Sequence, residues 1–182
     1  MANSATRTLP LSGVHGGSAT VRLESAAPAE RINLRVRAED VAALSAALGV
    51  ELPVRPKTSA SANGRTALWL GPDEWLVIGD DGNGLMQACG QSGALHSAAD
   101  VSHRNTAILV SGPGAAAAIN TGCPQDLSLS VFPVGACSRT IFGKVEIVLL
   151  RTAEDAFRLE VWRSFSDYAF GLLTEGARDA AL

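Results

Sequence analysis

TALWLGPDEWLVIGD, residues 66–80, contains two of the chain's three tryptophans, one on each side of a Gly-Pro-Asp turn. Residues 66–70 and 74–78 are each predicted as a short strand, because bulky apolar residues dominate both and proline sets the backbone of the turn. Period-two alternation puts Trp69 on the face opposite Leu68, and Trp75 on the face opposite Leu76. Because both faces are apolar, we predict a hairpin that is covered on both sides.

Around this hairpin, alternating apolar residues predict further strands, and apolar residues at helical spacing predict short helices. The predicted strands cover residues 31–37, 106–110, 137–142, 145–151 and 156–162, the last with clean alternation, and a looser alternation includes Val21 and Leu23. The predicted helices cover residues 41–48, ended by Gly49, residues 85–99, residues 113–119, and a C-terminal segment capped by Ser164 that buries Phe165, Tyr168, Leu172 and Leu173. Antiparallel hairpins with a few short helices indicate an α+β fold.

Two polar stretches divide the chain. Residues 1–20 are rich in glycine and serine, and we expect a flexible N-terminal arm there. Residues 21–182 are predicted to form one domain or two small lobes that share an interface. Within them, prolines and small polar residues predict a surface loop at residues 53–65, which is the best candidate for a boundary between lobes.

Composition excludes several classes of partner. Apolar residues make up 47% of the chain, 15 Lys and Arg stand against 18 Asp and Glu, and no window gathers the basic residues into a stripe. A nucleic-acid partner is therefore not expected. No apolar run approaches the roughly 20 residues that cross a bilayer, and the N-terminus lacks the apolar region of a secretory signal. We expect a cytoplasmic protein without a membrane partner.

No motif of catalysis or metal binding stands out. Cys89, Cys123 and Cys137 form no Cys-x-x-Cys pair and share no zinc-site spacing with the histidines. The segment VSGPGAAAA has the glycine spacing of a dinucleotide site but lacks the acidic strand end that such a site needs, so it predicts a tight turn and a helix. In DVSHRN, residues 100–105, neighbouring side chains alternate and cannot converge on one reacting atom. The predicted catalytic, cofactor-binding and metal-binding residues are none.

Four segments, taken together and in this order, resemble the gamma subunit of heterotetrameric sarcosine oxidase. They are ALWLGPDEWLVIG, DVSHRN, GCPQDLSLSVFPVGACSRT and FRLEVWRSFSDYAFGLL, within residues 65–175. The resemblance implies a fold related to the folate-binding domain of aminomethyltransferases. It also implies an assembly with alpha, beta and delta subunits that oxidatively demethylates sarcosine to glycine, forms hydrogen peroxide and passes the one-carbon unit to tetrahydrofolate. FAD, FMN, NAD and zinc would then belong to the other subunits, and this chain would carry no cofactor and play a structural role.

An assembly role requires a docking surface, and aromatic residues and arginine are enriched at the centres of such surfaces. The candidate subunit-interface residues are Trp69, Trp75, His103, Arg104, Trp162 and Arg163. Of the two hairpin tryptophans we expect one in the core and one near an interface. Two alternatives stay open: a stand-alone folate-dependent one-carbon transferase or repair factor, and the same subunit role in an oxidase for another N-methylated amino acid, such as dimethylglycine.

Overall fold

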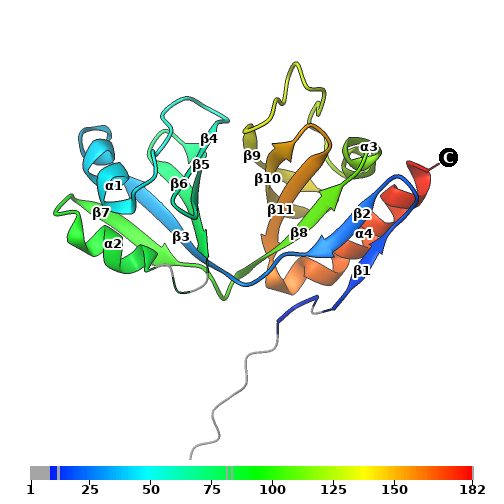
Figure 1. The fold of residues 1–182 in the computed structure, drawn as a ribbon, viewed down its shortest axis with the longest axis horizontal. Coiled ribbons are helices and arrows are strands. Elements are labelled where there is room, and N and C mark those ends of the chain that lie inside the picture. Colours follow the sequence, from blue (N-terminus) through cyan, green and yellow to red (C-terminus); the bar gives the residue numbers. More distant parts are fainter. Residues whose placement is uncertain (1–8, 12, 81, 83, 182) are drawn as a thin grey trace, which may run out of the picture.

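The computed structural model describes residues 9–181 except residues 12, 81 and 83, and it confirms an α+β fold built on two antiparallel sheets (Figure 1). The strand order is β1-β2-β8-β11-β10-β9 in the six-stranded sheet and β4-β5-β6-β3-β7 in the five-stranded sheet. The strands are β1 (His15–Gly17), β2 (Arg22–Ser25), β3 (Ala29–Val36), β4 (Ser59–Ala62), β5 (Arg65–Gly71), β6 (Glu74–Asp80), β7 (His96–Asp100), β8 (Asn105–Ser111), β9 (Cys137–Phe142), β10 (Val145–Ala153) and β11 (Ala156–Trp162). The helices are η1 (Ala38–Asp40), α1 (Val41–Leu48), α2 (Leu85–Gln91), α3 (Ala115–Asn120), η2 (Arg163–Phe165) and α4 (Ser166–Asp179).

The predicted hairpin is confirmed as β5 and β6, with Trp69 opposite Trp75 in the antiparallel register. Its two faces are buried against different neighbours. Ala67, Trp75 and Val77 face α1 and α2, whereas Leu68, Leu76 and Ile78 face the six-stranded sheet. Full burial of a Leu, Ile or Val side chain stabilises the fold by about 1.5–3 kcal/mol, so covering both faces accounts for the apolar character of both.

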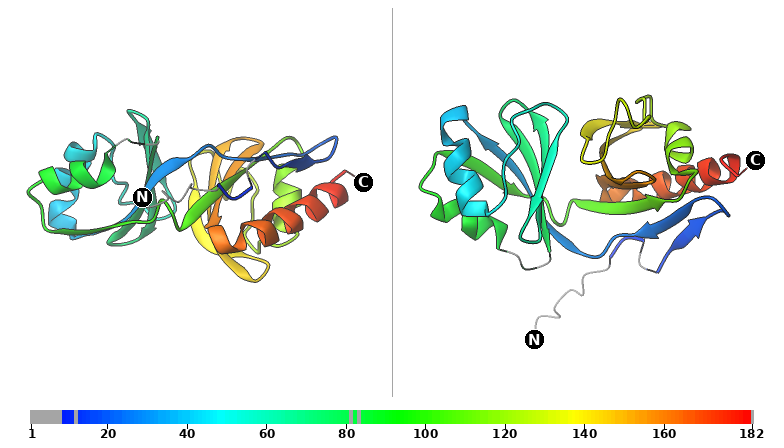
Figure 2. Two further views of the ribbon diagram at one scale, coloured as in Figure 1. Left: turned by 90° about the horizontal axis from the view of Figure 1, so that it is seen from below. Right: turned by 45° about the horizontal axis from the view of Figure 1, so that its top comes forward.

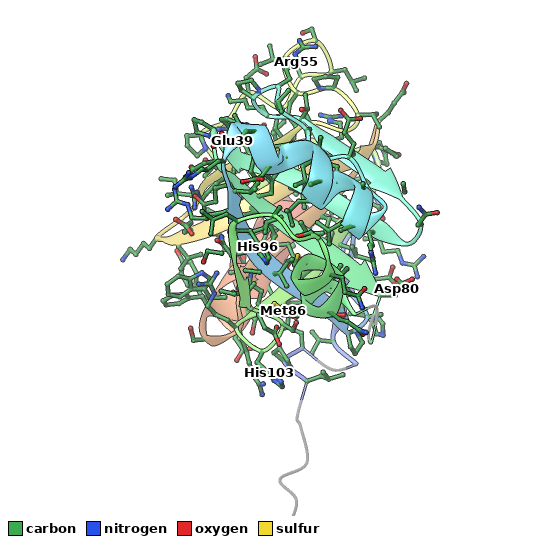
Figure 3. All side chains as sticks on the ribbon, turned by 90° about the vertical axis from the view of Figure 1, so that its left-hand side faces the viewer. Glu39, Arg55, Asp80, Met86, His96 and His103 are labelled. Atoms are coloured by element: carbon green, nitrogen blue, oxygen red, sulfur yellow. The ribbon has the colours of Figure 1, made fainter. Side chains whose placement is uncertain are left out.

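The two sheets form the inner layers of the molecule and the helices form its outer layers. Helices α1 and α2 cover the outer face of the five-stranded sheet, while α3 and α4 cover that of the six-stranded sheet (Figures 1 and 2). Figure 3 shows α1 and α2 in front of their sheet, with Met86 on α2. The chain passes from one sheet to the other between β2 and β3 and again between β7 and β8. Among the described residues, no helix is both long and apolar enough to span a membrane.

A buried ionic cluster joins the two sheets. The Arg31 guanidinium of β3 donates from Nε to Glu160 Oε2 of β11 at 2.7 Å, and the two side chains are only 3% and 1% exposed. Arg158 donates from Nε to the other carboxylate oxygen of Glu160 at 2.8 Å. One carboxylate, itself 1% exposed, therefore serves two guanidinium groups between the sheets.

Some strands differ from the prediction because edge strands and short hairpins use small or polar residues. Strand β1 lies within the expected arm, where Phe170 of α4 stands 3.1 Å from the position that a Cβ on Gly16 would take. Residues 1–8 and 12 lie outside the described residues. Strand β4 lies within the expected 53–65 loop and pairs with β5 through a turn in which Asn63 and Gly64 have φ of 52° and 71°. The 53–65 segment does not separate the two sheets, since β3 and β5 on either side of it belong to the same sheet.

The predicted helix over 85–99 is too long. Helix α2 ends at Gln91, Gly93 adopts a φ of 69°, and the chain continues as the edge strand β7. The small residues of HSAAD carry no alternating apolar signal, so the sequence did not show this strand.

The predicted cap and buried face of the last helix are wrong. No side-chain cap bond precedes α4, and the hydroxyl of Ser166 donates to the carbonyl of Arg163. Phe165 and Tyr168 are 41% and 42% exposed. The face toward the sheet consists of Ala169, Phe170, Leu173 and Ala177, so of the predicted stripe only Leu173 is fully buried. The small residues of this face let α4 lie close to the sheet and to α3, which turns the larger aromatic side chains outward.

Candidate subunit interface

Four of the six candidate interface residues meet where β8 begins and β11 ends. His103 and Arg104 form the turn before β8, while Trp162 ends β11 and Arg163 begins η2. Antiparallel pairing of β8 with β11 places Asn105 opposite Trp162, which brings the two segments together. The Arg163 N–H donates to the Arg104 carbonyl at 2.7 Å. His103 lies at the lower end of the molecule in Figure 3, beyond the helices that cover the five-stranded sheet.

Exposed aromatic side chains surround this junction. Trp162 is 40% exposed and stacks on Phe165 with ring centroids 6.1 Å apart and an interplanar angle of 28°. The guanidinium carbon of Arg104 lies 5.3 Å from the centre of the Trp162 ring, within cation–π range. Tyr168 follows Phe165 by about one helical turn, and its hydroxyl accepts a hydrogen bond from the Lys144 N–H at 3.3 Å. We call Arg104, Trp162, Phe165 and Tyr168 the aromatic patch.

The chemistry of the aromatic patch suits contact with another macromolecule. Its rings present a large apolar area to water, and clustered exposed apolar groups mark interaction sites more often than single ones do. Arg104 adds a charge whose planar group already rests on an aromatic ring, so little side-chain freedom would be lost on docking. The sequence pointed to Arg104 and Trp162 but missed Phe165 and Tyr168, because both had been placed on the buried face of the helix.

The two hairpin tryptophans have different surroundings. Trp75 is fully buried, with its indole Nε1 donating to the Pro53 carbonyl at 2.8 Å, and it belongs to the core under α1 and α2. Trp69 is half-buried and packs against apolar clusters on both sides of the five-stranded sheet. Of the pair, only Trp69 reaches the surface of this chain.

The DVSHRN segment uses its polar groups to hold the backbone. The Ser102 hydroxyl donates to Asp100 Oδ1 at 2.6 Å and accepts from the Arg31 N–H at 2.9 Å. The Ser102 N–H also donates to Asp100 Oδ1, at 2.8 Å. This pattern is that of a side-chain turn that fixes the end of β7 against β3. The hydroxyl is thereby held by the Asp100 carboxylate and the Arg31 N–H.

The three cysteines are buried and protonated at neutral pH. Burial raises the pKa of Cys137 to about 12 and raises the pKa of Cys89 and Cys123 above the ordinary thiol value. Thiolates are the reactive and metal-binding form, so these side chains act as small apolar residues. Within the described part of the chain, no three His, Cys, Asp or Glu side chains are grouped so that they could hold a metal ion.

The glycine-rich segment before α3 is a tight turn, as predicted. Gly112 has a φ of 113°, and a Cβ there would lie 2.4 Å from the Thr20 carbonyl oxygen. Strand β8, which leads into this turn, pairs antiparallel with both β2 and β11. A dinucleotide fold requires parallel strands at this place, so the glycines serve backbone packing.

Comparison with known families identifies the relatives of this chain. The model of the sarcosine oxidase gamma subunit family (SoxG) matches residues 36–179. The sarcosine oxidase subunit gamma of an Arthrobacter species is 34% identical over 119 residues, which cover 64% of this chain and 59% of that protein. The corresponding subunit of Corynebacterium sp. strain P-1 is 30% identical over 169 residues, which cover 89% of this chain and 82% of that protein. In the Arthrobacter protein and in that of Corynebacterium sp. strain U-96, the matched region spans 59% and 63% of the relative's length.

Solved structures agree with these relatives. A chain of the heterotetrameric sarcosine oxidase from Corynebacterium sp. U-96, solved with pyrrole 2-carboxylate, superimposes with a TM-score of 0.80 and 30% identity over 89% of this chain and 86% of that one. The aminomethyltransferase T of the glycine cleavage system from Bartonella henselae gives a TM-score of 0.64 at 15% identity, over 85% of this chain and 45% of that one, and so shares the fold. The family match over most of the chain, the similar relatives and the shared fold together show that the chain belongs to the sarcosine oxidase gamma subunit family.

Proposed function

We propose that this chain is a structural, non-catalytic subunit of a heterotetrameric sarcosine oxidase and that it docks onto a larger subunit through the aromatic patch. The observation that carries the proposal is the exposure of three neighbouring rings, Trp162, Phe165 and Tyr168, at 40–42% each. Such rings supply most of the binding energy at subunit contacts once they are buried. Arg104 and Arg163 next to them, with His103 in the adjoining turn, would form the polar part of the same contact.

The proposal extends to the assembly that the family describes. The partners would be the alpha, beta and delta subunits, in the cytoplasm. The complex would oxidatively demethylate sarcosine to glycine, form hydrogen peroxide and transfer the one-carbon unit to tetrahydrofolate. FAD, FMN, NAD and zinc would be bound by the partner subunits. The buried, protonated thiols and the structurally bound Ser102 hydroxyl of this chain support a role without catalysis.

The test is purification of the tagged chain from its host, with measurement of complex mass, flavin absorbance and sarcosine-dependent peroxide. The variant Trp162→Ala with Phe165→Ala should recover at least ten-fold less of the large subunits, since hot-spot truncations cost about 2 kcal/mol or more. Met86→Ala is the matched control, because Met86 is 42% exposed and lies on α2. Thermal unfolding of the purified chains shows whether both variants keep the fold.

Two results would contradict the proposal. Equal recovery of partners by the double variant and by Met86→Ala would exclude the aromatic patch as the docking surface. Recovery of the wild-type chain alone, without flavin, would exclude the subunit role, and saturable tetrahydrofolate binding would then favour a stand-alone transferase. Peroxide formed with dimethylglycine but not with sarcosine would keep the subunit role and change the substrate.

A further inference from the structure

A second site lies between the sheets, on β4, β5, β6, β10 and β11 rather than on the aromatic patch. A pocket of about 480 Å³ is bounded there by Ser61, Thr66 and Ile78 from the five-stranded sheet and by Leu150, Thr152 and Arg158 from the six-stranded sheet. Its volume falls in the range of small-molecule sites, about 300–1,000 Å³. A second hollow of about 420 Å³ shares Ser59, Val134 and Gly135 with it, so the two are continuous.

The pocket combines an apolar floor with two arginines, Arg151 and Arg158, and several hydroxyl groups. Leu150 and Ile78 belong to the apolar cluster between the sheets. Arg158 is the register partner of Leu150 on the neighbouring strand, which directs its side chain to the same inner face. The hydroxyl groups of Ser61 and Thr66 lie 2.9 Å apart and are exposed, so they can turn toward a ligand. Together these groups suit a molecule with an apolar body and a polar end.

The charge of the site is not balanced within the chain. Arg158 shares the single carboxylate of Glu160 with Arg31, which takes the other oxygen. Arg158 Nη2 lies 2.8 Å from Glu160 Oε1, yet it is buried and makes no hydrogen bond of good geometry. The Arg158 side chain is nevertheless 19% exposed and lines the pocket, so a ligand oxygen can approach its guanidinium group.

The surroundings raise the positive potential further. Arg55 and Lys57 line the adjoining hollow, and among the described residues no carboxylate lines either pocket. Arg151, which also lines the pocket, is 2% exposed. Its guanidinium lies over the Phe157 ring at 4.4 Å and donates to the carbonyls of Leu127 and Glu154. Several positive charges around a partly buried cleft attract anions, and the attraction is stronger there than in bulk water.

We propose that this inter-sheet pocket binds the carboxylate or phosphate group of a small molecule that also has an apolar body. Arg158 forms the charged contact with the oxyanion, because a guanidinium matches two oxygens of a planar or tetrahedral anion. The hydroxyl groups of Thr66 and Thr152 complete the polar end, while Ile78 and Leu150 receive the apolar body. The site uses no residue of the aromatic patch and does not depend on the proposed docking.

Titration of the full-length chain on its own tests this inference, since other subunits then contribute no site. The probes are benzoate, phenyl phosphate and benzamide, the last being the neutral counterpart of benzoate. We expect saturable calorimetric binding of benzoate, phenyl phosphate or both, with dissociation constants on the order of 1 mM, and at least ten-fold weaker binding of benzamide. Whichever of the two anions binds more tightly identifies the group.

Variants locate the binding. Arg158→Gln should weaken anion binding at least ten-fold, and Arg158→Lys should retain part of it. Arg178→Gln, which changes a 65% exposed arginine of α4, should leave it unchanged. If Arg158→Gln fails to fold, Ser61→Trp serves instead, because Ser61 is exposed and the indole would fill the mouth of the pocket.

Three outcomes would overturn the inference. Equal affinity for benzamide and benzoate would mean a purely apolar pocket. Equal loss of anion binding in Arg158→Gln and Arg178→Gln, or unchanged binding in Ser61→Trp, would mean nonspecific attraction to surface charge. Binding by the lone chain that is lost in the purified complex would mean that a partner chain and not a small molecule fills the site.

Discussion

Replacing Glu160 by glutamine should destabilise the fold more than any conservative surface change, because the Glu160 carboxylate accepts hydrogen bonds from both Arg31 and Arg158. The carboxylate is 1% exposed and accepts hydrogen bonds at 2.7 Å from Arg31 and at 2.8 Å from Arg158. A glutamine of the same shape can offer its oxygen to one guanidinium, but its amide N–H groups would then face the other. The variant therefore keeps the volume and removes the charge.

The magnitude follows from two losses. One charge-assisted hydrogen bond, of about 1.5–3 kcal/mol, disappears, and one buried guanidinium is left without its counter-charge at a further cost of about 1–3 kcal/mol. The sum agrees with the 3–5 kcal/mol or so measured when one partner of a buried ion pair is removed. Since domains of this size are stable by about 5–15 kcal/mol, Glu160→Gln should lower the denaturant midpoint by about a fifth or more.

The assay is urea denaturation followed by tryptophan fluorescence, in which buried Trp75 reports the core of the five-stranded sheet. Glu175→Gln is the matched control, because Glu175 and Arg178 form an ion pair of 2.7 Å with side chains 66% and 65% exposed. That pair should contribute about 0.5 kcal/mol or less. A loss below about 1 kcal/mol in Glu160→Gln, or one equal to that of Glu175→Gln, would refute the view that this cluster holds the sheets together.

Three further expectations concern packing and ionisation. Gly176→Ala should destabilise the fold by about 1–3 kcal/mol, because the new Cβ would lie 2.5 Å from a carbonyl oxygen of α3. Gly171→Ala on the same helix should stabilise it by up to about 1 kcal/mol, because its Cβ would meet nothing within 4 Å. Thermal unfolding compares the two variants. Cys137 has a pKa of about 12 in the folded chain and therefore holds a proton that the unfolded chain releases near pH 9. The free energy of unfolding should fall by up to about 1.4 kcal/mol per pH unit between pH 9 and 12. Thiol reagents at pH 8 should react with Cys137 only after denaturation. Trp75→Phe should cost about 1–3 kcal/mol, because the indole N–H bond at 2.8 Å is lost and its buried carbonyl acceptor is left unpaired, and equal stability of this variant in urea would contradict that account.

The strands that the sequence missed all lie at sheet edges, whereas the predicted strands are inner ones except for β9. The hairpin of residues 66–78 and strand β11, which ends at Trp162, occupy inner positions. A strand on each side and at least one covering layer bury their side chains, which favours large apolar residues. The missed strands β1, β4 and β7 are all edges, built from HGG, SASA and HSAAD. An edge strand needs few apolar side chains, because one side of it is open to water. The sequences of these edge strands therefore lack the alternating apolar pattern that predicts a strand.

The sequence identified individual residues of the candidate interface, but it did not show that they lie together on one surface. Arg104 and Trp162 are exposed aromatic or guanidinium groups, and their type alone identified them. Their contact depends on the pairing of β8 with β11, strands joined through some 45 residues of intervening chain, which no local pattern reveals. Phe165 and Tyr168 were missed because several residues on the buried face of α4 are small, namely Ala169, Gly176 and Ala177. A prediction that selects the largest apolar side chains therefore assigned the wrong face.

Strand β11 shows how one alternating segment supplies several roles. Phe157, Leu159 and Val161 enter the core under α3 and α4, as clean alternation predicts. The other parity, Arg158, Glu160 and Trp162, would ordinarily face water, since charged residues on alternate positions are typical of a solvated sheet face. Here that face meets a second sheet, so its charges must be paired or used. Glu160 is paired across the sheets, Arg158 lines a pocket between them, and Trp162 is 40% exposed at the strand end. Along one strand, an inter-sheet link therefore lies two residues from the proposed ligand site and two residues from the proposed docking surface.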